Sequence, residues 1–249
     1  MFEQLGKRIY KLGRALDDPH LFLLKRKGVD ISYYKFLMQP WFTSLGIDTV
    51  IDVGANEGQF SYMIHEVLPE AAIYSFEPLT DCYYTLIKKM AGCQRFMAFN
   101  VAAGDADKDI SFYRSSMAVC SSPLAMATLH KRNFPKSANE QHLLVPMRTL
   151  DSMMAEIELG KHPFIKIDVQ GFEDRVLAGG RETIQSALIV IIECSFCELY
   201  YGQASFDFIH DTMRSLGFRY AGSINPNIAS TDSRLLQEDC IFLGNAFYP

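Results

Sequence analysis

A pair of glycines in one turn is the first feature of this sequence that could do chemistry. Gly54 and Gly58 follow residues 49–53, a short apolar run that predicts a buried strand. Glycine lets the backbone turn tightly and approach a ligand closely, and a helix that opens after the turn offers N–H groups to an anionic ligand. Asp52 lies in the run, and Asn56 lies between the glycines. The turn predicts a nucleotide-like cofactor, although a tight turn without a ligand would have the same pattern.

Glu77 is the second such feature, because it follows the next predicted strand, residues 72–76. An acidic side chain at that strand end can accept hydrogen bonds from both hydroxyls of a ribose. Pro78 ends the strand and fixes the place of the carboxylate. The simpler interpretation is a helix-capping or surface glutamate. A dinucleotide fingerprint would have glycine where Asn56 stands, which disfavours a nicotinamide-dependent oxidoreductase but keeps it as the alternative enzyme class.

The elements that must position these residues alternate between strands and helices from residue 48 onward. This alternation predicts an α/β fold with a mostly parallel, doubly wound sheet and helices on both faces. Ligands bind such sheets outside the carboxyl ends of the strands, where residues 52–58, Glu77, Asn100, Asp168 and Glu193 are expected. The predicted strands are residues 49–53, 72–76, 95–100, 110–113, 143–146, 164–168, 188–193, 218–221 and 240–243, and the predicted helices are residues 59–67, 81–90, 173–178 and 205–216.

Two stretches with a helical spacing of apolar residues come before this alternating region. They are residues 2–16 and residues 32–45, and Pro40 breaks the second. We therefore expect an N-terminal helical extension over residues 1–46 and an α/β domain over residues 47–249.

Composition and charge narrow the class of protein. A chain of 249 residues that is 49% hydrophobic can form a sizeable hydrophobic core. The formal net charge of −5 argues against a general nucleic-acid binder. No apolar run approaches the roughly 20 residues that a membrane span needs. The six scattered cysteines suggest reduced thiols and hence a cytoplasmic protein. The sequence leaves open whether the protein forms an oligomer.

Five segments taken together resemble the FkbM-type methyltransferases. They are residues 50–60 (VIDVGANEGQF), 76–78 (FEP), 100–104 (NVAAG), 149–151 (TLD) and 166–173 (KIDVQGFE), in the order seen in that family. The resemblance covers roughly residues 48–195. It implies a seven-stranded class I methyltransferase sheet, S-adenosylmethionine as the cofactor, and methyl transfer to a hydroxyl oxygen of a saccharide or secondary metabolite. The acceptor would thus be a small molecule or a glycan.

Gln170 is a departure from this pattern, because the family often has glutamate there. The departure puts in doubt any acid–base or metal role at this position. It also leaves open a third class, a cofactor-binding module that has the fold without the catalysis.

The resemblance also implies where the cofactor lies. The cofactor would cross residues 54–58, with its methionine end above Asp52 and its ribose on Glu77, and residues 100–102 would flank the adenine. The implied cofactor-binding residues are Asp52, Gly54, Asn56, Gly58, Glu77, Asn100 and Ala102.

Proton removal is a separate requirement, since a hydroxyl acceptor needs a general base or a metal ion. Asp168 is the first candidate base, because it ends a strand in the predicted crevice. Side chains alternate along a strand, so Lys166 shares its face, and a partly buried lysine needs a charged partner. We expect Glu193 to be that partner, which makes these three residues the catalytic candidates, although Lys166 and Glu193 could form a purely structural pair.

Two alternatives remain for this chemistry. Asp168 and Glu193 could hold Mg²⁺ through oxygen ligands, but no clear cluster supports this, and no metal ligand is assigned. Histidines could be the base, His130 and His142 first among them, because they lie in the irregular region 115–142, where substrate contacts are expected. The aromatic residues that follow Glu193, including Tyr200, fit core packing better than ligand stacking.

Overall fold

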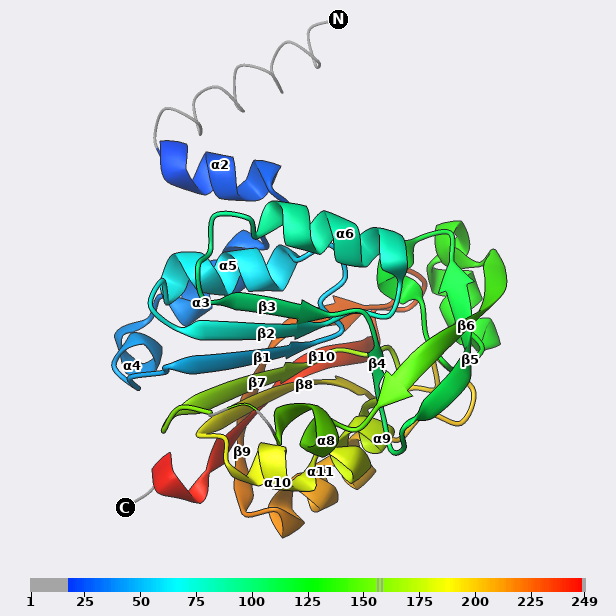
Figure 1. Ribbon diagram of the computed structural model, residues 1–249. Helices are drawn as coiled ribbons and strands as arrows, with labels where there is room; N and C mark the ends of the chain where they lie inside the picture. The colour runs from blue at the N-terminus through cyan, green and yellow to red at the C-terminus, as the bar shows by residue number, and fades with distance from the viewer. Residues whose placement is uncertain (1–17, 156, 158, 248–249) are drawn as a thin grey trace, which may run out of the picture.

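A seven-stranded sheet forms the centre of the protein in the computed structural model, which describes residues 18–155, 157 and 159–247 (Figure 1). The strand order is β3-β2-β1-β7-β8-β10-β9. β10 pairs antiparallel with β8 and β9, and the other neighbours are parallel. The predicted mostly parallel sheet is thus confirmed. The strands are β1 (Thr49–Val53), β2 (Ala72–Phe76), β3 (Phe96–Phe99), β7 (Pro163–Ile167), β8 (Ile189–Ser195), β9 (Phe218–Ile228) and β10 (Leu235–Gly244).

Helices cover both faces of this sheet, because alternate apolar side chains of the inner strands point to opposite sides. Val50 and Phe164 belong to one hydrophobic cluster, and Ile51 and Ile165 belong to another. The first cluster receives α2 (Pro19–Arg26), α3 (Ile31–Leu37), α4 (Pro40–Thr43), α5 (Gln59–Val67) and α6 (Thr80–Lys89). The second receives α8 (Leu150–Met154), α9 (Glu173–Gly179), α10 (Arg181–Gln185) and α11 (Phe206–Ser215).

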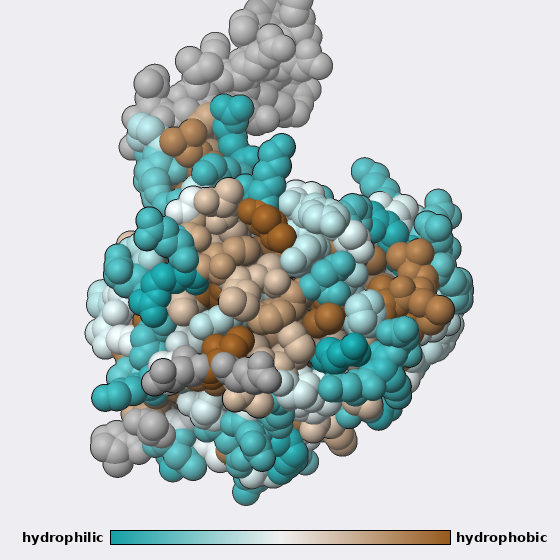
Figure 2. Space-filling view, in the orientation of Figure 1, coloured by the Kyte–Doolittle hydropathy of each residue, from teal (hydrophilic) through white to brown (hydrophobic). Residues whose placement is uncertain are grey.

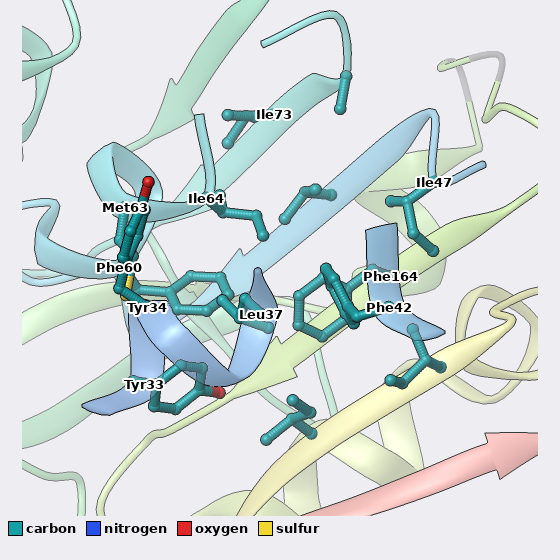
Figure 3. Packing of buried hydrophobic residues seen from close by; sticks show 14 of the residues in the cluster. Tyr33, Tyr34, Leu37, Phe42, Ile47, Phe60, Met63, Ile64, Ile73 and Phe164 are labelled. Atoms are coloured by element: carbon teal, nitrogen blue, oxygen red, sulfur yellow. The ribbon is translucent and has the colours of Figure 1, made fainter. Parts of the chain in front are cut away.

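The helices that precede β1 pack directly on the first face (Figure 3). The ring of Phe42 from α4 lies 5.5 Å from that of Phe164, which in turn lies 5.8 Å from Phe60 of α5. The predicted break at Pro40 is confirmed, since α3 ends before it and α4 begins with it. The helix predicted over residues 2–16 lies outside the described residues. The division between extension and domain at residue 46 stays a prediction.

A second, smaller sheet of three strands stands beside the carboxyl ends of the main sheet (Figure 1). Its order is β4-β6-β5, and the two strands expected around the irregular region pair antiparallel in it. Short helices that the sequence did not predict fill the region between them. We call residues 102–148 the cap. Its elements are β4 (Ala102–Ala103), β5 (Lys108–Ser115), η1 (Ala118–Cys120), α7 (Thr128–Asn133), η2 (Pro135–Ser137) and β6 (Glu140–Arg148), and the described chain ends in η3 (Asn245–Phe247).

The surface at the β3 edge of the main sheet carries exposed apolar side chains. Figure 2 shows apolar residues gathered on the face that is turned to the viewer. Met97 on β3 and Tyr84 and Ile87 on α6 are exposed. In the part of the chain that the structure describes, no helix has both the length and the apolar character needed to cross a membrane.

The turn after β1 depends on a glycine at its first position. Gly54 has a φ of +86°, and a Cβ built there would lie 1.9 Å from the carbonyl oxygen of Asp168. The backbone N–H of Asp168 donates to the carbonyl of Val53 at 2.9 Å, so the end of β7 is held against this turn. The absence of a side chain at Gly54 thus allows the two strand ends to touch.

We predict that Gly54→Ala destabilises the protein by on the order of 3 kcal/mol, because it adds a left-handed alanine and a backbone clash. Chemical denaturation followed by circular dichroism measures the change. Gly92→Ala is the matched control, since a Cβ there meets no atom within 4 Å. Equal unfolding free energies for the two variants would contradict this account of the turn.

Candidate active site

A cavity of about 260 Å³ opens at the carboxyl ends of β1, β2 and β7 and beside the cap. Its walls include part of the predicted site and several residues that the sequence did not single out. Predicted residues in the wall are Gly54, Asn56, Glu77, Ala102, Lys166 and Asp168, while Asp52, Gly58, Asn100 and Glu193 do not line it. Residues that were not predicted include Phe60, Leu79, Phe112 and Phe172, and the wall also contains Val101, from the segment expected to flank the adenine, and Gln170.

Glu77 is the buried acid of the cofactor side, with 5% of its surface exposed. One carboxylate oxygen accepts the backbone N–H of Asn56 at 2.8 Å, and the other accepts that of Leu79 at 2.7 Å. Burial raises the pKa of Glu77 to about 7, although these two N–H groups lower it. The carboxylate thus fixes the glycine turn while it lines the cavity. Each oxygen keeps a lone pair for a further donor.

Asn56 shows why this turn tolerates a side chain at its centre. Its φ is +47°, in the left-handed region that asparagine adopts more readily than most residues. Its side-chain oxygen is buried and has no hydrogen-bond partner among the described residues, although Asn56 lines the cavity. A buried acceptor without a donor is costly, so a ligand donor is expected there.

Asp52 lies beneath the turn and not in the cavity wall. It is 1% exposed, and its Oδ2 accepts the Ser61 hydroxyl at 2.5 Å. Its other oxygen has no partner within the described chain. Burial raises the pKa of Asp52 to about 6, and the ammonium of Lys166 and the Ser61 hydroxyl act against this rise.

Gly58 and Asn100 are structural supports of the same turn. Gly58 is the residue before α5, with a φ of +79°, and a Cβ there would lie 2.6 Å from Leu86. The side-chain amide of Asn100 donates to the backbone carbonyls of Glu77 and Pro78 at 2.9 and 3.0 Å. Asn100 therefore shapes the cavity through the backbone after β2.

The proposed catalytic pair is Lys166 and Asp168. The Lys166 ammonium donates to Asp168 Oδ2 at 2.8 Å, and Lys166 is 6% exposed. Burial would lower the pKa of Lys166, but the carboxylates of Asp168, Asp239 and Asp52 raise it. Burial would likewise raise the pKa of Asp168, but Lys166 and the Gln170 amide hold it below its usual range. Both groups are therefore charged at neutral pH.

Glu193 is not the direct partner that the sequence led us to expect for Lys166. The strand register pairs Lys166 with Ile191, so Glu193 lies level with the residue after β7. Its two carboxylate oxygens accept hydrogen bonds from the amides of Gln170, at 2.7 Å, and Gln237. Burial and the nearby Asp168 carboxylate raise the pKa of Glu193 well above its ordinary value.

Gln170 joins the two carboxylates. Its side-chain nitrogen donates to Asp168 Oδ1 at 2.8 Å and to Glu193 Oε2 at 2.7 Å. The amide therefore lies between the two groups that had been considered as Mg²⁺ ligands, and both oxygens of Asp168 already accept hydrogen bonds. Across residues 18–155, 157 and 159–247 no group of three or more histidines, cysteines and carboxylates could hold a metal ion.

Glu173 is a site residue whose role the sequence did not reveal. Its Oε1 accepts the backbone N–H groups of Val169 and Gly171 at 3.1 and 3.2 Å. Burial raises its pKa to about 7. Glu173 thus holds the loop that carries Asp168 and Gln170. Its place at the first turn of a predicted helix, three residues after Gln170, was the available signal.

The histidines lie away from the cavity wall in the described part of the chain. His130 is 2% exposed, and burial lowers its pKa to about 4. His142 is exposed on β6 and contacts the ring of Tyr113. His162 lies before β7, at the opposite end of the sheet, and contacts the backbone of Gly46. These positions disfavour a histidine as the base.

Comparison with known proteins decides the family. Residues 52–220 match the methyltransferase FkbM domain. The chain belongs to the FkbM methyltransferase family. It is 28% identical over 172 residues to the 2-O-methyltransferase NoeI of Sinorhizobium fredii (strain NBRC 101917 / NGR234), an alignment that covers 67% of this chain and 71% of NoeI.

Two solved structures also align with this chain. Magnesium protoporphyrin IX methyltransferase (ChlM) from Synechocystis PCC 6803 with bound S-adenosylmethionine aligns with a TM-score of 0.48 at 13% identity, over 90% of this chain and 81% of ChlM. The fibrillarin pre-rRNA processing protein of Methanococcus jannaschii aligns with a TM-score of 0.44 at 10% identity, over 80% of this chain and 67% of that one.

The protein is therefore an S-adenosylmethionine-dependent methyltransferase, and the oxidoreductase alternative is not favoured. The residues present fit this cofactor. Gly54 has no side chain, so the backbone of the turn can come close to the cofactor. Glu77 has lone pairs that can accept hydrogen bonds from it, and the buried side-chain oxygen of Asn56 has no donor among the described residues.

We predict that Glu77→Gln weakens the binding of S-adenosylhomocysteine by on the order of 2–4 kcal/mol, because it removes a charged acceptor for the ribose hydroxyls. Isothermal titration calorimetry measures the affinity. Glu57→Gln, an exposed change in the same turn, is the control and keeps the wild-type affinity. If both variants bind equally well, Glu77 is not the ribose anchor.

The raised pKa of Glu77 predicts that the affinity depends on pH. Ribose hydroxyls donate to the charged carboxylate, so binding is strongest above the free-state pKa of about 7 and weakens below it. The dissociation constant should rise by up to about tenfold per pH unit below that value. Calorimetry at several pH values tests this, and Glu77→Gln should flatten the profile. A flat wild-type profile would contradict it.

Proposed function

We propose that this methyltransferase transfers a methyl group to a hydroxyl oxygen of a saccharide or secondary metabolite. The similarity to a protein named as a 2-O-methyltransferase supports oxygen as the acceptor atom. The chemistry of the cavity supports the same choice, since a hydroxyl loses a proton on methylation and an ionised carboxylate lies in the wall.

The observation that carries the proposal is the position of Asp168. It lines the cavity together with the glycine turn, and its carboxylate is held by Lys166 at 2.8 Å. S-adenosylmethionine supplies a methyl group that is already activated on a sulfonium. Asp168 then accepts the proton of the hydroxyl at its carboxylate oxygen, while Lys166 keeps that carboxylate ionised and oriented.

The binding residues divide the work with this base. Glu77 holds the ribose, and the turn from Gly54 to Gly58 brings the backbone against the cofactor. Asp52 stays beneath the turn, where its buried carboxylate favours the positively charged amino group of the methionine end. Ala102, in the cavity wall and small, leaves room for the adenine. Glu193 is a neighbour of the base.

We also propose the cytoplasm as the location. All six cysteines are free, as expected for a reducing compartment. Fractionation of cells that express the tagged chain tests this, and recovery outside the cytoplasmic fraction would overturn it.

We predict that Asp168→Asn lowers turnover by about 10²-fold or more while the affinity for S-adenosylmethionine stays nearly unchanged, because the base is lost and the cofactor side is kept. Transfer of a labelled methyl group to a panel of saccharides and hydroxylated metabolites measures turnover, and calorimetry measures affinity.

The control for this prediction is Asp109→Asn, an exposed change on β5. It should keep the turnover of the wild type. Unimpaired turnover of Asp168→Asn would remove Asp168 from the mechanism. Loss of wild-type turnover in EDTA, restored by Mg²⁺, would favour a metal ion over a carboxylate base.

A further inference from the structure

Tyr200 places a hydroxyl group between the cap and the loop that follows β7, which carries Asp168 and Gln170. Its side chain is 2% exposed, although it lies in the turn region after β8. The hydroxyl lies 2.8 Å from Gln170 Oε1, 3.2 Å from His130 Nε2 and 3.1 Å from the carbonyl oxygen of Cys120. The mechanism above uses neither Tyr200 nor His130.

The donors and acceptors in this cluster have a fixed order. The nitrogen of Gln170 donates to both Asp168 and Glu193, so the oxygen of Gln170 faces Tyr200. That oxygen and the carbonyl oxygen of Cys120 can both only accept, so they compete for the single tyrosine proton, and the shorter contact, 2.8 Å against 3.1 Å, favours Gln170. With its proton on Gln170, the Tyr200 oxygen accepts the N–H of His130 in the tautomer that carries the proton on Nε2, while Nδ1 lies 3.5 Å from the Ser137 hydroxyl.

In this arrangement a chain of hydrogen bonds runs from the cap to the proposed base. It passes from His130 to Tyr200, from Tyr200 to Gln170, and from Gln170 to the two carboxylates. The reversed amide would turn the Gln170 oxygen toward two carboxylates and its nitrogen toward a tyrosine proton. An amide oxygen that faces two carboxylates is repelled by them, and the Tyr200 hydroxyl, which donates to that oxygen in the observed orientation, stabilises the same choice.

The backbone of Gln170 is also held from the cap side. Its φ is +56°, a region that a glutamine seldom adopts. The Ser122 hydroxyl donates to the backbone carbonyl of Gln170 at 2.7 Å. The cap thus holds the backbone of Gln170, and Tyr200, which contacts the cap at Cys120 and His130, holds its side chain.

We propose that Tyr200 is a positioning residue for methyl transfer, which fixes the Gln170 amide so that its nitrogen holds Asp168 ionised and correctly oriented. This inference rests on the proposed role of Asp168 as the base.

Other groups also face Asp168 and contribute to its titration. They are Lys166, the carboxyl groups of Asp52, Glu173, Glu193 and Asp239, and the neutral Tyr33 and Cys120. None of them is changed when the Tyr200 hydroxyl is removed. Without that hydroxyl the Gln170 amide can turn away from Asp168, and loss of its donor disfavours the charged form, so we expect the pKa of Asp168 to rise.

The test compares Tyr200→Phe with Tyr201→Phe. Tyr200→Phe keeps the buried ring and removes the hydroxyl, whereas Tyr201 is 53% exposed and contacts Thr128 at the surface. For Tyr200→Phe we expect kcat to fall by about 10–100-fold, the KM for S-adenosylmethionine to stay within about twofold, and the acid limb of the kcat profile to move up by about one pH unit. Tyr201→Phe should match the wild type.

Gln170→Glu is the second variant. An ionised glutamate cannot donate to Asp168 and adds a negative charge beside it, so the acid limb should move up further than in Tyr200→Phe. Thermal melting confirms that each variant is folded. A Tyr200→Phe enzyme with the wild-type kcat and pH profile overturns the inference, and so does one that changes only KM.

Carboxyl ¹³C NMR separates this inference from the proposed function. A raised titration of Asp168 in Tyr200→Phe supports the hydrogen-bond chain even if Asp168→Asn keeps full turnover, which would sink only the role as base. If Asp168→Asn abolishes turnover while Tyr200→Phe changes neither the titration nor the profile, the base stands and the positioning role of Tyr200 fails.

Discussion

The buried ammonium of Lys166 is the interaction on which the rest of the site depends. It lies among the carboxylates of Asp168, Asp52 and Asp239, which all raise its pKa. Removing one partner from a buried ion pair costs about 3–5 kcal/mol, because a charge is left without compensation. The charge of Lys166 therefore allows these acidic groups to stay close together at the end of the sheet. Asp52 lies on the proposed cofactor side of Lys166, and Asp168 lies on the proposed acceptor side.

The parallel pairing of β1 with β7 brings the proposed cofactor-binding turn next to the proposed base. Gly54 has no side chain, so the turn above Asp52 can touch the backbone of Asp168. Glu77 fixes the other side of this turn through the N–H of Asn56. A change in the backbone at the end of β1 therefore also alters the position of the end of β7. Gln170, whose backbone is held by Ser122 of the cap, adds a second link, so the proposed base is held from the core by an ion pair with Lys166 and from the other side by the Gln170 amide.

The inner part of the fold could be predicted because buried parallel strands are continuous apolar runs. The predicted bounds of β1, β2 and α5 agree with the structure. β9 was predicted too short, because most of its residues are exposed and lack an apolar pattern. The glycine turn and Glu77 could be found from spacing alone. The partner of Lys166 and the role of Gln170 could not, because they depend on a strand register and on Tyr200, thirty residues away in the chain.

A crystal structure with S-adenosylhomocysteine bound tests the central claim most directly, since it shows the cofactor product and the acceptor space together. The account predicts that both ribose hydroxyls lie within hydrogen-bond distance of Glu77, and that the sulfur faces the part of the cavity lined by Asp168. A ribose away from Glu77, or a sulfur separated from Asp168 by the protein, would contradict it.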